Sequence, residues 1–265
     1  MNTPDVPLRF ELSIEVPGTP EQVWDAIATA NGISSWMTPT ELEEREGGRV
    51  VFHMGEGVSS PGSISGWEPP RRLVYEEPEW AALGGHDPST VTPMVTEFLV
   101  EATSGGSCVV RVVSSAFGSG ADWEQEFIQE MGQGWAPMFD HLRLYLAHFP
   151  GQQVTTMEVD TELPGTPEQA MAAVRTALGV EEIGQTLEVR GQAAQVERVD
   201  GLLLRLTHPV PGLLAFYSRG TGKDTCSIWI GGYLFGRDAR PYVERETPGW
   251  RAWLAGLPAQ APAAR

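Results

Sequence analysis

The sequence predicts an α+β fold made of two related units in tandem. Extended segments rich in β-branched and aromatic residues precede a long helical pattern, which is typical of such folds. The string Pro-Gly-Thr-Pro-Glu-Gln occurs at 17–22 and again at 164–169, and the two cysteines of the chain fall in matching segments. We therefore expect one unit at 1–150 and a second, shorter unit at 151–265.

The repeated string has the residues of a helix start. Thr19 suits the N-cap, Pro20 the first helical position, and Gln22 can complete a capping box with Thr19. Extended segments precede the two copies, at 8–16 and 153–163. Six residues alone are also compatible with chance convergence on a good helix cap, so the duplication depends on further matches.

Two further matches keep the same order along the chain. The segment containing Cys108 (107–118) aligns with the segment containing Cys226 (225–236), and Gly-Trp pairs follow at 134–135 and 249–250. The offset between the copies falls from 147 at the helix cap to 118 at the cysteine segment, a loss of 29 residues. The sequence thus indicates a tandem duplication with an abbreviated second copy, in which the two cysteines stay unbonded to each other.

Composition and charge restrict the class of protein. The chain has 265 residues, of which 41% are apolar, and no run long enough for a transmembrane helix. No secretory signal pattern precedes the first strand, and one thiol in each unit suits a reducing compartment, so we expect a cytoplasmic protein. The net charge is −17, and residues 1–150 hold 22 acidic and 7 basic side chains, which disfavours nucleic acid and anionic membranes as partners.

The first unit is expected to contain a strand, a capped helix, a short helix at 32–37, several antiparallel strands and a closing helix. The closing helix runs from Asp122 to Phe149, and its apolar stripes predict a helix buried on much of its surface. Gly and Pro punctuation separates the intervening strands. These strands are expected at 40–46, 48–54, 62–68, 71–77, 93–102 and 107–117.

A search for catalytic or metal-binding motifs is negative. His141 and His148 stand two helical turns apart, too far to share an ion, and neither HExxH nor CxxC occurs. We therefore expect no metal, no cofactor and no catalytic set. Strand alternation places His53 and three further charged residues on outward faces. These three are Glu97, Glu101 and Arg111.

Several segments in series resemble the START/Bet v 1-like (SRPBCC) superfamily, in its chaperone-ATPase-activator-like and polyketide-cyclase-like branch. They are IEVPGTPEQVWDAIATANGISSWM, GGRVVF, GWEPPRRLVYEEP, VTEFLVEATSGGSCVVRVVSSAF and GWAPMFDHLRLYL, which together span most of 8–148. The resemblance implies a helix-grip fold, in which a curved antiparallel sheet wraps a long C-terminal helix. It also implies a cavity between sheet and helix that holds a hydrophobic small molecule.

The first unit has the residue types of an adaptable apolar cavity, since it is rich in tryptophan and methionine. Ordinary interdigitated core packing is the alternative for each of these residues. The second unit is expected to be a mainly structural companion that closes on Leu202, Leu204, Leu206, Leu213 and Leu214. The candidate ligand-binding residues are Trp36, Phe52, Met54, Trp67, Tyr75, Trp80, Phe98, Cys108, Trp123, Phe127, Met131 and Trp135.

Three functions are compatible with these expectations. The first is a carrier or sequestering protein for a bulky hydrophobic or aromatic, polyketide-like molecule; the resemblance adds a narrower version, self-resistance to an antibiotic of the enediyne type. The second is a polyketide cyclase or aromatase, which would turn over without loss of protein. The third is a chaperone-activator-like interaction module, which would capture a chaperone in a pull-down.

Overall fold

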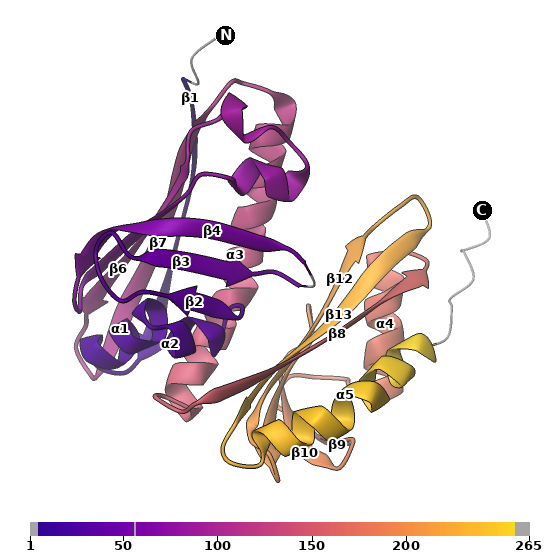
Figure 1. Cartoon of the computed structure of the whole chain (residues 1–265). Coiled ribbons are helices and arrows are strands. Elements are labelled where there is room, and N and C mark those ends of the chain that lie inside the picture. The colour runs from indigo at the N-terminus through magenta and orange to yellow at the C-terminus, as the bar shows by residue number, and fades with distance from the viewer. Residues whose placement is uncertain (1–4, 56, 258–265) are drawn as a thin grey trace. The chain divides into compact units, whose positions relative to one another are not determined.

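The computed structural model describes residues 5–55 and 57–257, and the chain divides into two compact units (Figure 1). Unit 1 is Met1–Gly151 and unit 2 is Gln152–Arg265. Each unit combines one antiparallel sheet with a C-terminal helix, which is the predicted α+β class. Among the described residues, no helix is both long and apolar enough to cross a bilayer.

Unit 1 contains a seven-stranded antiparallel sheet in the order β1-β7-β6-β5-β4-β3-β2, with α3 lying along one face (Figure 1). Its helical elements are α1 (Pro20–Ala28), α2 (Ala30–Ser34), the 3₁₀ turns η1 (Trp80–Gly84) and η2 (Pro88–Thr90), and α3 (Asp122–His148). Its strands are β1 (Val6–Pro17), β2 (Thr40–Leu42), β3 (Arg49–His53), β4 (Ser59–Glu68), β5 (Arg72–Glu77), β6 (Met94–Ala102) and β7 (Ser107–Gly118).

Unit 2 repeats this plan with a six-stranded sheet in the order β8-β13-β12-β11-β10-β9. Its helices are α4 (Pro167–Leu178) and α5 (Ala239–Ala255). Its strands are β8 (Val154–Pro164), β9 (Thr186–Val189), β10 (Gln192–Arg198), β11 (Leu203–His208), β12 (Gly212–Gly220) and β13 (Thr225–Phe235).

The strands that contain the cysteines confirm the duplication. Both β7 and β13 lie second in their sheets, antiparallel to the first strand of the unit. The register is also the same, because Cys108 is opposite Val16 and Cys226 is opposite Leu163, each followed by the Pro-Gly-Thr start of the next helix. Both thiols are buried and free, as expected.

The repeated helix caps form as predicted in both units. Thr19 Oγ1 accepts the N–H of Gln22 at 3.4 Å, while the Gln22 side chain accepts the N–H of Thr19 at 2.9 Å. In unit 2 the corresponding distances for Thr166 and Gln169 are 3.3 and 2.9 Å. Each capping box therefore satisfies two backbone donors that the first helical turn leaves open.

Replacing Thr19 or Thr166 by Ala is expected to lower the free energy of unfolding by about 1 kcal/mol, because each change leaves a helix N-terminus without its side-chain acceptor. Urea denaturation of the full chain measures the change, and Thr→Ser at the same position is the control, since it keeps the hydroxyl. Equal losses for Ala and Ser would contradict the capping role.

The abbreviation of unit 2 has a definite location in the fold. In unit 1 the link from β5 to β6 spans residues 78–93 and includes η1 and η2, whereas β11 and β12 are joined by residues 209–211 alone. Unit 2 also has one strand fewer, and α5 has 17 residues where α3 has 27. The five leucines expected to close this unit are all buried.

Some predicted boundaries in unit 1 were wrong. The strand expected at 40–46 ends at Leu42, because Glu43 N–H bonds to the carbonyl of Arg49 and the acidic segment forms the turn to β3. The short helix ends at Ser34 rather than at 37.

The first half of α3 is only partly buried, with Phe127 and Met131 half-exposed, because it faces a cavity instead of a filled core.

The outward orientation of the four charged strand residues is confirmed, since Glu101 is exposed and the other three contact charged partners. His53 contacts Glu41 at 3.2 Å, Arg72 donates to Glu97 at 2.5 Å, and Arg111 contacts Glu11 at 3.3 Å. These pairs lie at the solvent side of the sheet, where ion pairs contribute little to stability. They leave the opposite face free for apolar side chains.

Candidate ligand-binding site

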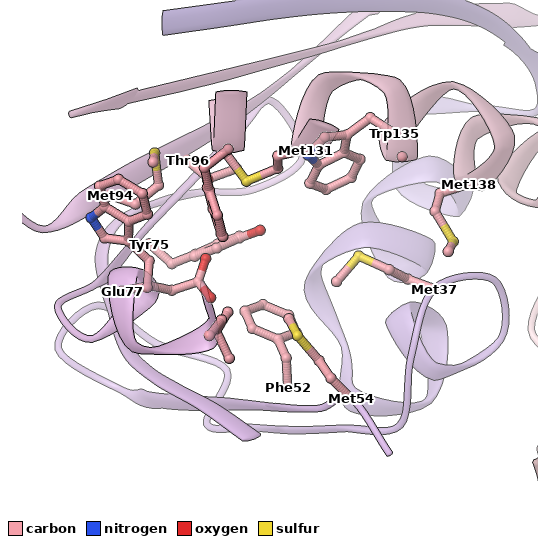
Figure 2. Close-up of a pocket in the computed structure, with 14 residues that line it drawn as sticks. Met37, Phe52, Met54, Tyr75, Glu77, Met94, Thr96, Met131, Trp135 and Met138 are labelled. Atoms are coloured by element: carbon pink, nitrogen blue, oxygen red, sulfur yellow. The ribbon is translucent and has the colours of Figure 1, made fainter. Parts of the chain in front are cut away.

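An apolar cavity of about 270 Å³ lies in unit 1 between α3 and the sheet (Figure 2). Strands β3, β5 and β6 form one wall, α3 forms the other, and η1 closes one end. The lining residues are Met37, Phe52, Met54, Tyr75, Glu77, Trp80, Leu83, Met94, Thr96, Phe127, Met131, Gly134, Trp135 and Met138.

The periodicity of each element explains why these side chains face the cavity. On α3, Phe127, Met131 and Met138 recur at intervals of about one or two turns and so share one face. On the sheet, Tyr75 is opposite Thr96 and Glu77 is opposite Met94 in the β5–β6 ladder. Alternation turns this block of four residues toward the cavity and the intervening residues away from it.

Methionine dominates the flexible part of the lining. Five of the eight methionines of the chain line this cavity: Met37, Met54, Met94, Met131 and Met138. The unbranched thioether side chain adapts its rotamers and makes favourable contacts with aromatic rings. The lining can therefore adjust to ligands of different outline without displacement of the backbone.

Aromatic rings supply the stiffer part of the wall. Phe52 and Tyr75 lie 5.1 Å apart between ring centroids, and Trp80 and Phe127 also lie 5.1 Å apart. Trp135 packs edge-on against Phe98 at 5.5 Å, which holds its indole between the cavity and the core. Such contacts fix the rings before any ligand arrives, and ring faces toward the cavity favour flat aromatic molecules.

A small polar group interrupts the apolar lining on β5. The carboxyl group of Glu77 points toward the cavity and accepts a hydrogen bond from Ser60 Oγ at 2.5 Å (Figure 2). Desolvation by the surrounding apolar groups raises the pKa of Glu77 to about 7, although the Ser60 bond opposes the shift. Burial and the neighbouring Glu77 carboxyl also raise the pKa of Tyr75 well above its usual value.

The N-terminus of α3 is anchored so that the helix wall of the cavity is fixed. Glu124 is fully buried and accepts bonds from Ser119 N at 2.8 Å, from Ser119 Oγ at 2.8 Å and from Gly120 N at 2.9 Å. Desolvation raises the pKa of Glu124, but these hydrogen bonds together lower it by a larger amount. The pKa of Glu124 is therefore below its usual value. Gly118 leaves the space that this carboxylate occupies, since a Cβ there would lie 2.1 Å from it.

The mouth of the cavity is formed by Met54, Leu83 and Gly134. Met54 and Leu83 are 46% and 37% exposed. Gly134 lines the cavity, and a Cβ built on it meets no atom within 4 Å. A Cβ built on Gly132, two residues earlier on α3, would lie 3.6 Å from Phe10 of β1, which is an ordinary van der Waals contact.

The structure brings seven of the twelve candidate residues to the cavity and places five elsewhere. The seven are Phe52, Met54, Tyr75, Trp80, Phe127, Met131 and Trp135. Trp36 is buried behind Trp135 and donates its indole N–H to Ala26 O at 2.9 Å, and Phe98 lies behind Trp135 and Tyr75.

The remaining three candidates form separate contacts. Trp67 packs edge-on against Trp24 at 5.0 Å, and Trp123 stacks on His86 at 3.8 Å. Cys108 is fully buried beside the helix cap, where its thiol donates to Gly18 O at 3.4 Å. Residue type alone did not distinguish these positions from the lining. The hydrophobic pattern of the sequence does not show which parts of a strand or helix border the cavity.

Several lining residues were absent from the candidate set. Glu77 shares its strand face with Tyr75, so strand alternation predicts that it points inward. The neighbouring pair of acidic residues, Glu76 and Glu77, is instead typical of a solvent-exposed segment. Met94 and Thr96 lie on the predicted inward face with Phe98. Met37 is in an irregular segment and Leu83 is in the short 3₁₀ turn η1, and neither segment carries a periodic signal.

The pocket found in unit 2 differs from this cavity. Unit 2 has an open, polar depression of about 480 Å³ lined by Gln152, Gln153, Thr155, Gly236, Arg237 and Arg240. Its Trp250, the counterpart of Trp135, is fully buried in the core. Within residues 5–55 and 57–257, no group of three or more His, Cys, Asp or Glu side chains is placed to hold a metal ion.

Comparison with solved structures finds several proteins to which this chain is similar. A protein from Mesorhizobium loti is 18% identical, with a TM-score of 0.45, and the match covers 53% of this chain and 98% of that one. The di-domain ARO/CYC protein BexL from the BE-7585A biosynthetic pathway is 14% identical, with a TM-score of 0.44, covering 96% and 99%. DynU16, from the dynemicin biosynthetic locus, is 13% identical, with a TM-score of 0.42, covering 96% and 97%.

Comparison with curated proteins finds no match. Comparison with protein families finds that residues 17–147 match the family described as Activator of Hsp90 ATPase homolog 1-like protein. This match runs from the first helix cap to the end of α3 and includes every lining residue of the cavity. The first unit therefore matches the Activator of Hsp90 ATPase homolog 1-like family over 131 of the 265 residues of the chain.

Proposed function

We propose that unit 1 binds a bulky, largely apolar or aromatic small molecule in the cavity beneath α3, and that the protein acts as a carrier or sequestering protein for it. The observation that supports this proposal is the cavity itself. Its lining is apolar apart from Glu77, Tyr75 and Thr96, and its rings and methionines suit a flat hydrophobic ligand. Unit 2 would then be a structural companion, since its interior holds a packed cluster of buried side chains.

A second candidate function, catalysis of polyketide cyclisation or aromatisation, is favoured by Glu77. A carboxyl group with a pKa of about 7 inside an apolar cavity has the proton affinity of an efficient general acid or base at neutral pH. Repeated turnover of a poly-β-ketone substrate without loss of protein would support this candidate. One-to-one binding without product would support the carrier.

The narrower role of antibiotic self-resistance rests on the superfamily resemblance alone. It predicts that a reactive enediyne is consumed in proportion to the protein added, with the chain itself cleaved or modified. Intact-mass spectrometry after incubation distinguishes this outcome from reversible binding.

The binding proposal is tested with Gly134→Leu, which adds a side chain at a lining position where a built Cβ meets no atom within 4 Å. The neutral fluorescent probe N-phenyl-1-naphthylamine is expected to bind the wild-type chain, and the variant is expected to lose about tenfold or more in affinity, because the new side chain occupies cavity volume. Replacing a helical glycine also stabilises the helix by about 1 kcal/mol, so loss of binding would not reflect unfolding.

Gln133→Leu is the matched control, because Gln133 is the exposed neighbour on α3 and does not line the cavity. It adds the same apolar side chain to the surface and is expected to leave probe affinity unchanged. Equal probe affinity for Gly134→Leu and the wild type, with the thermal stability intact, would reject the cavity as the binding site.

A further inference from the structure

Glu77 is the one charged side chain among the residues that line the cavity. Its Oε1 atom accepts the hydrogen bond from Ser60, and Oε2 has no hydrogen-bond partner among the described residues. No Arg, Lys or His side chain in the described part of the chain forms an ion pair with it. A carboxyl group in an apolar wall therefore presents an unused acceptor to whatever occupies the cavity.

Few polar groups surround Glu77, so its carboxyl is the principal polar contact that the cavity offers a ligand. From β4 the neighbour is Ser60, and from β5 it is Tyr75, the one other titratable group in the lining. The Thr96 hydroxyl bonds to the hydroxyl of Ser114 at 2.8 Å, so these two hydroxyls satisfy each other. The residues that α3 and η1 contribute to the lining include no titratable side chain.

We infer that the ligand of this cavity is an apolar or aromatic molecule with one basic amine, whose ammonium ion pairs with the Glu77 carboxylate. This inference rests on the proposed binding function and names the chemical class of the ligand. A carboxylate held in an apolar wall without a cation is costly, and an ammonium group supplies the missing partner together with charge-assisted hydrogen bonds.

Two further features favour a cation over a neutral or anionic ligand. The rings of Phe52, Tyr75 and Trp80 line the cavity, and aromatic faces attract ammonium groups, most strongly where water is excluded. The surface of unit 1 also has a large acidic excess, with 22 acidic and 7 basic residues in 1–150. Such a field raises the local concentration of cations and repels anions before contact.

Ionisation of Glu77 gives the inference a pH signature. Because the pKa of Glu77 is raised to about 7, the carboxyl is largely neutral at pH 5.5 and largely ionised at pH 8. An amine that stays protonated over this range should therefore bind more tightly at pH 8. A neutral ligand of the same shape should show no such gain.

The experiment compares 1-naphthylmethylamine with 1-naphthalenemethanol, which has a hydroxyl in place of the amine, by titration calorimetry on the full chain. At pH 8 the amine is expected to bind the wild type about tenfold more tightly than the alcohol. Glu77→Gln is expected to abolish this preference while keeping the affinity for the alcohol. Glu76→Gln is the matched control, because Glu76 lies on the opposite face of β5 and should keep the preference.

Each outcome separates the ligand class from the binding function. Equal affinity of amine and alcohol for the wild type, or a preference that survives in Glu77→Gln, would overturn the amine assignment while leaving the cavity as a binding site. Binding of neither naphthalene compound, together with no binding of the neutral fluorescent probe, would overturn the binding function itself. Loss of alcohol binding in Glu77→Gln would also reject the inference, since the carboxylate would not then act on the amine alone.

Discussion

Trp135→Ala is expected to lower the free energy of unfolding by about 3–5 kcal/mol, the largest effect of any single substitution considered for unit 1. Trp135 is 9% exposed and contacts the rings of Phe10, Trp36, Phe98 and Phe139. Truncation removes these contacts and joins the vacated space to the existing cavity. The surrounding rings are held by their own packing and cannot close the void.

Urea denaturation with hydrogen exchange of unit 1 peptides measures this loss. Trp67→Ala is the control, because Trp67 is only half-buried, contacts Trp24 and does not line the cavity. Trp67→Ala should lower the free energy of unfolding by less than Trp135→Ala. A loss below about 1 kcal/mol for Trp135→Ala would show that the cavity collapses easily and is not held open by the aromatic wall.

Glu77→Gln is expected to stabilise the protein at pH 8 by about 2–3 kcal/mol and to have little effect near pH 4.5. The folded-state pKa of about 7 lies above the usual value of 4.5, so the folded protein holds the proton that the unfolded chain releases. The stability that this proton provides is fully present below pH 4.5 and is lost as the pH rises through 7. Glutamine is neutral throughout and does not lose it.

Denaturation curves of the wild type and the variant at pH 4.5, 6 and 8 measure this difference. The expected value follows from the difference between the folded-state pKa of about 7 and the usual value of 4.5, at about 1.36 kcal/mol per pKa unit. We reduce the result because the Glu77 side chain is partly exposed to solvent. Glu76→Gln should change stability equally at the three pH values. A constant difference between Glu77→Gln and the wild type would mean that Glu77 is solvated and ionised normally.

The two units show how one plan gives a cavity in unit 1 and a cluster of buried apolar side chains in unit 2. In unit 1 the 16 residues between β5 and β6 bring Trp80 and Leu83 to the end of the cavity, and a helix of 27 residues extends over it. In unit 2 a link of three residues and a helix of 17 leave no segment to span such a space. Interior side chains then pack against each other, because close packing is favoured wherever the backbone permits it.

Local signals in the sequence were sufficient for much of the fold. Both capping boxes, the α3 boundaries within one residue, and the equivalence of β7 and β13 followed from short-range chemistry and repeated order, since caps and alternation depend on residues close in the chain. The outward orientation of Glu97 and Arg111 followed for the same reason.

The sequence by itself determined the α+β class, the duplication, the two free thiols and the apolar character of the face that α3 turns to the sheet. Only the tertiary structure decided which apolar residues border empty space: Trp135 lines the cavity, whereas Trp36 and Phe98 stand behind it. It also decided that Glu77 faces inward. The physical reason is that a cavity depends on the separation of elements distant in the chain, which residue type and periodicity do not encode.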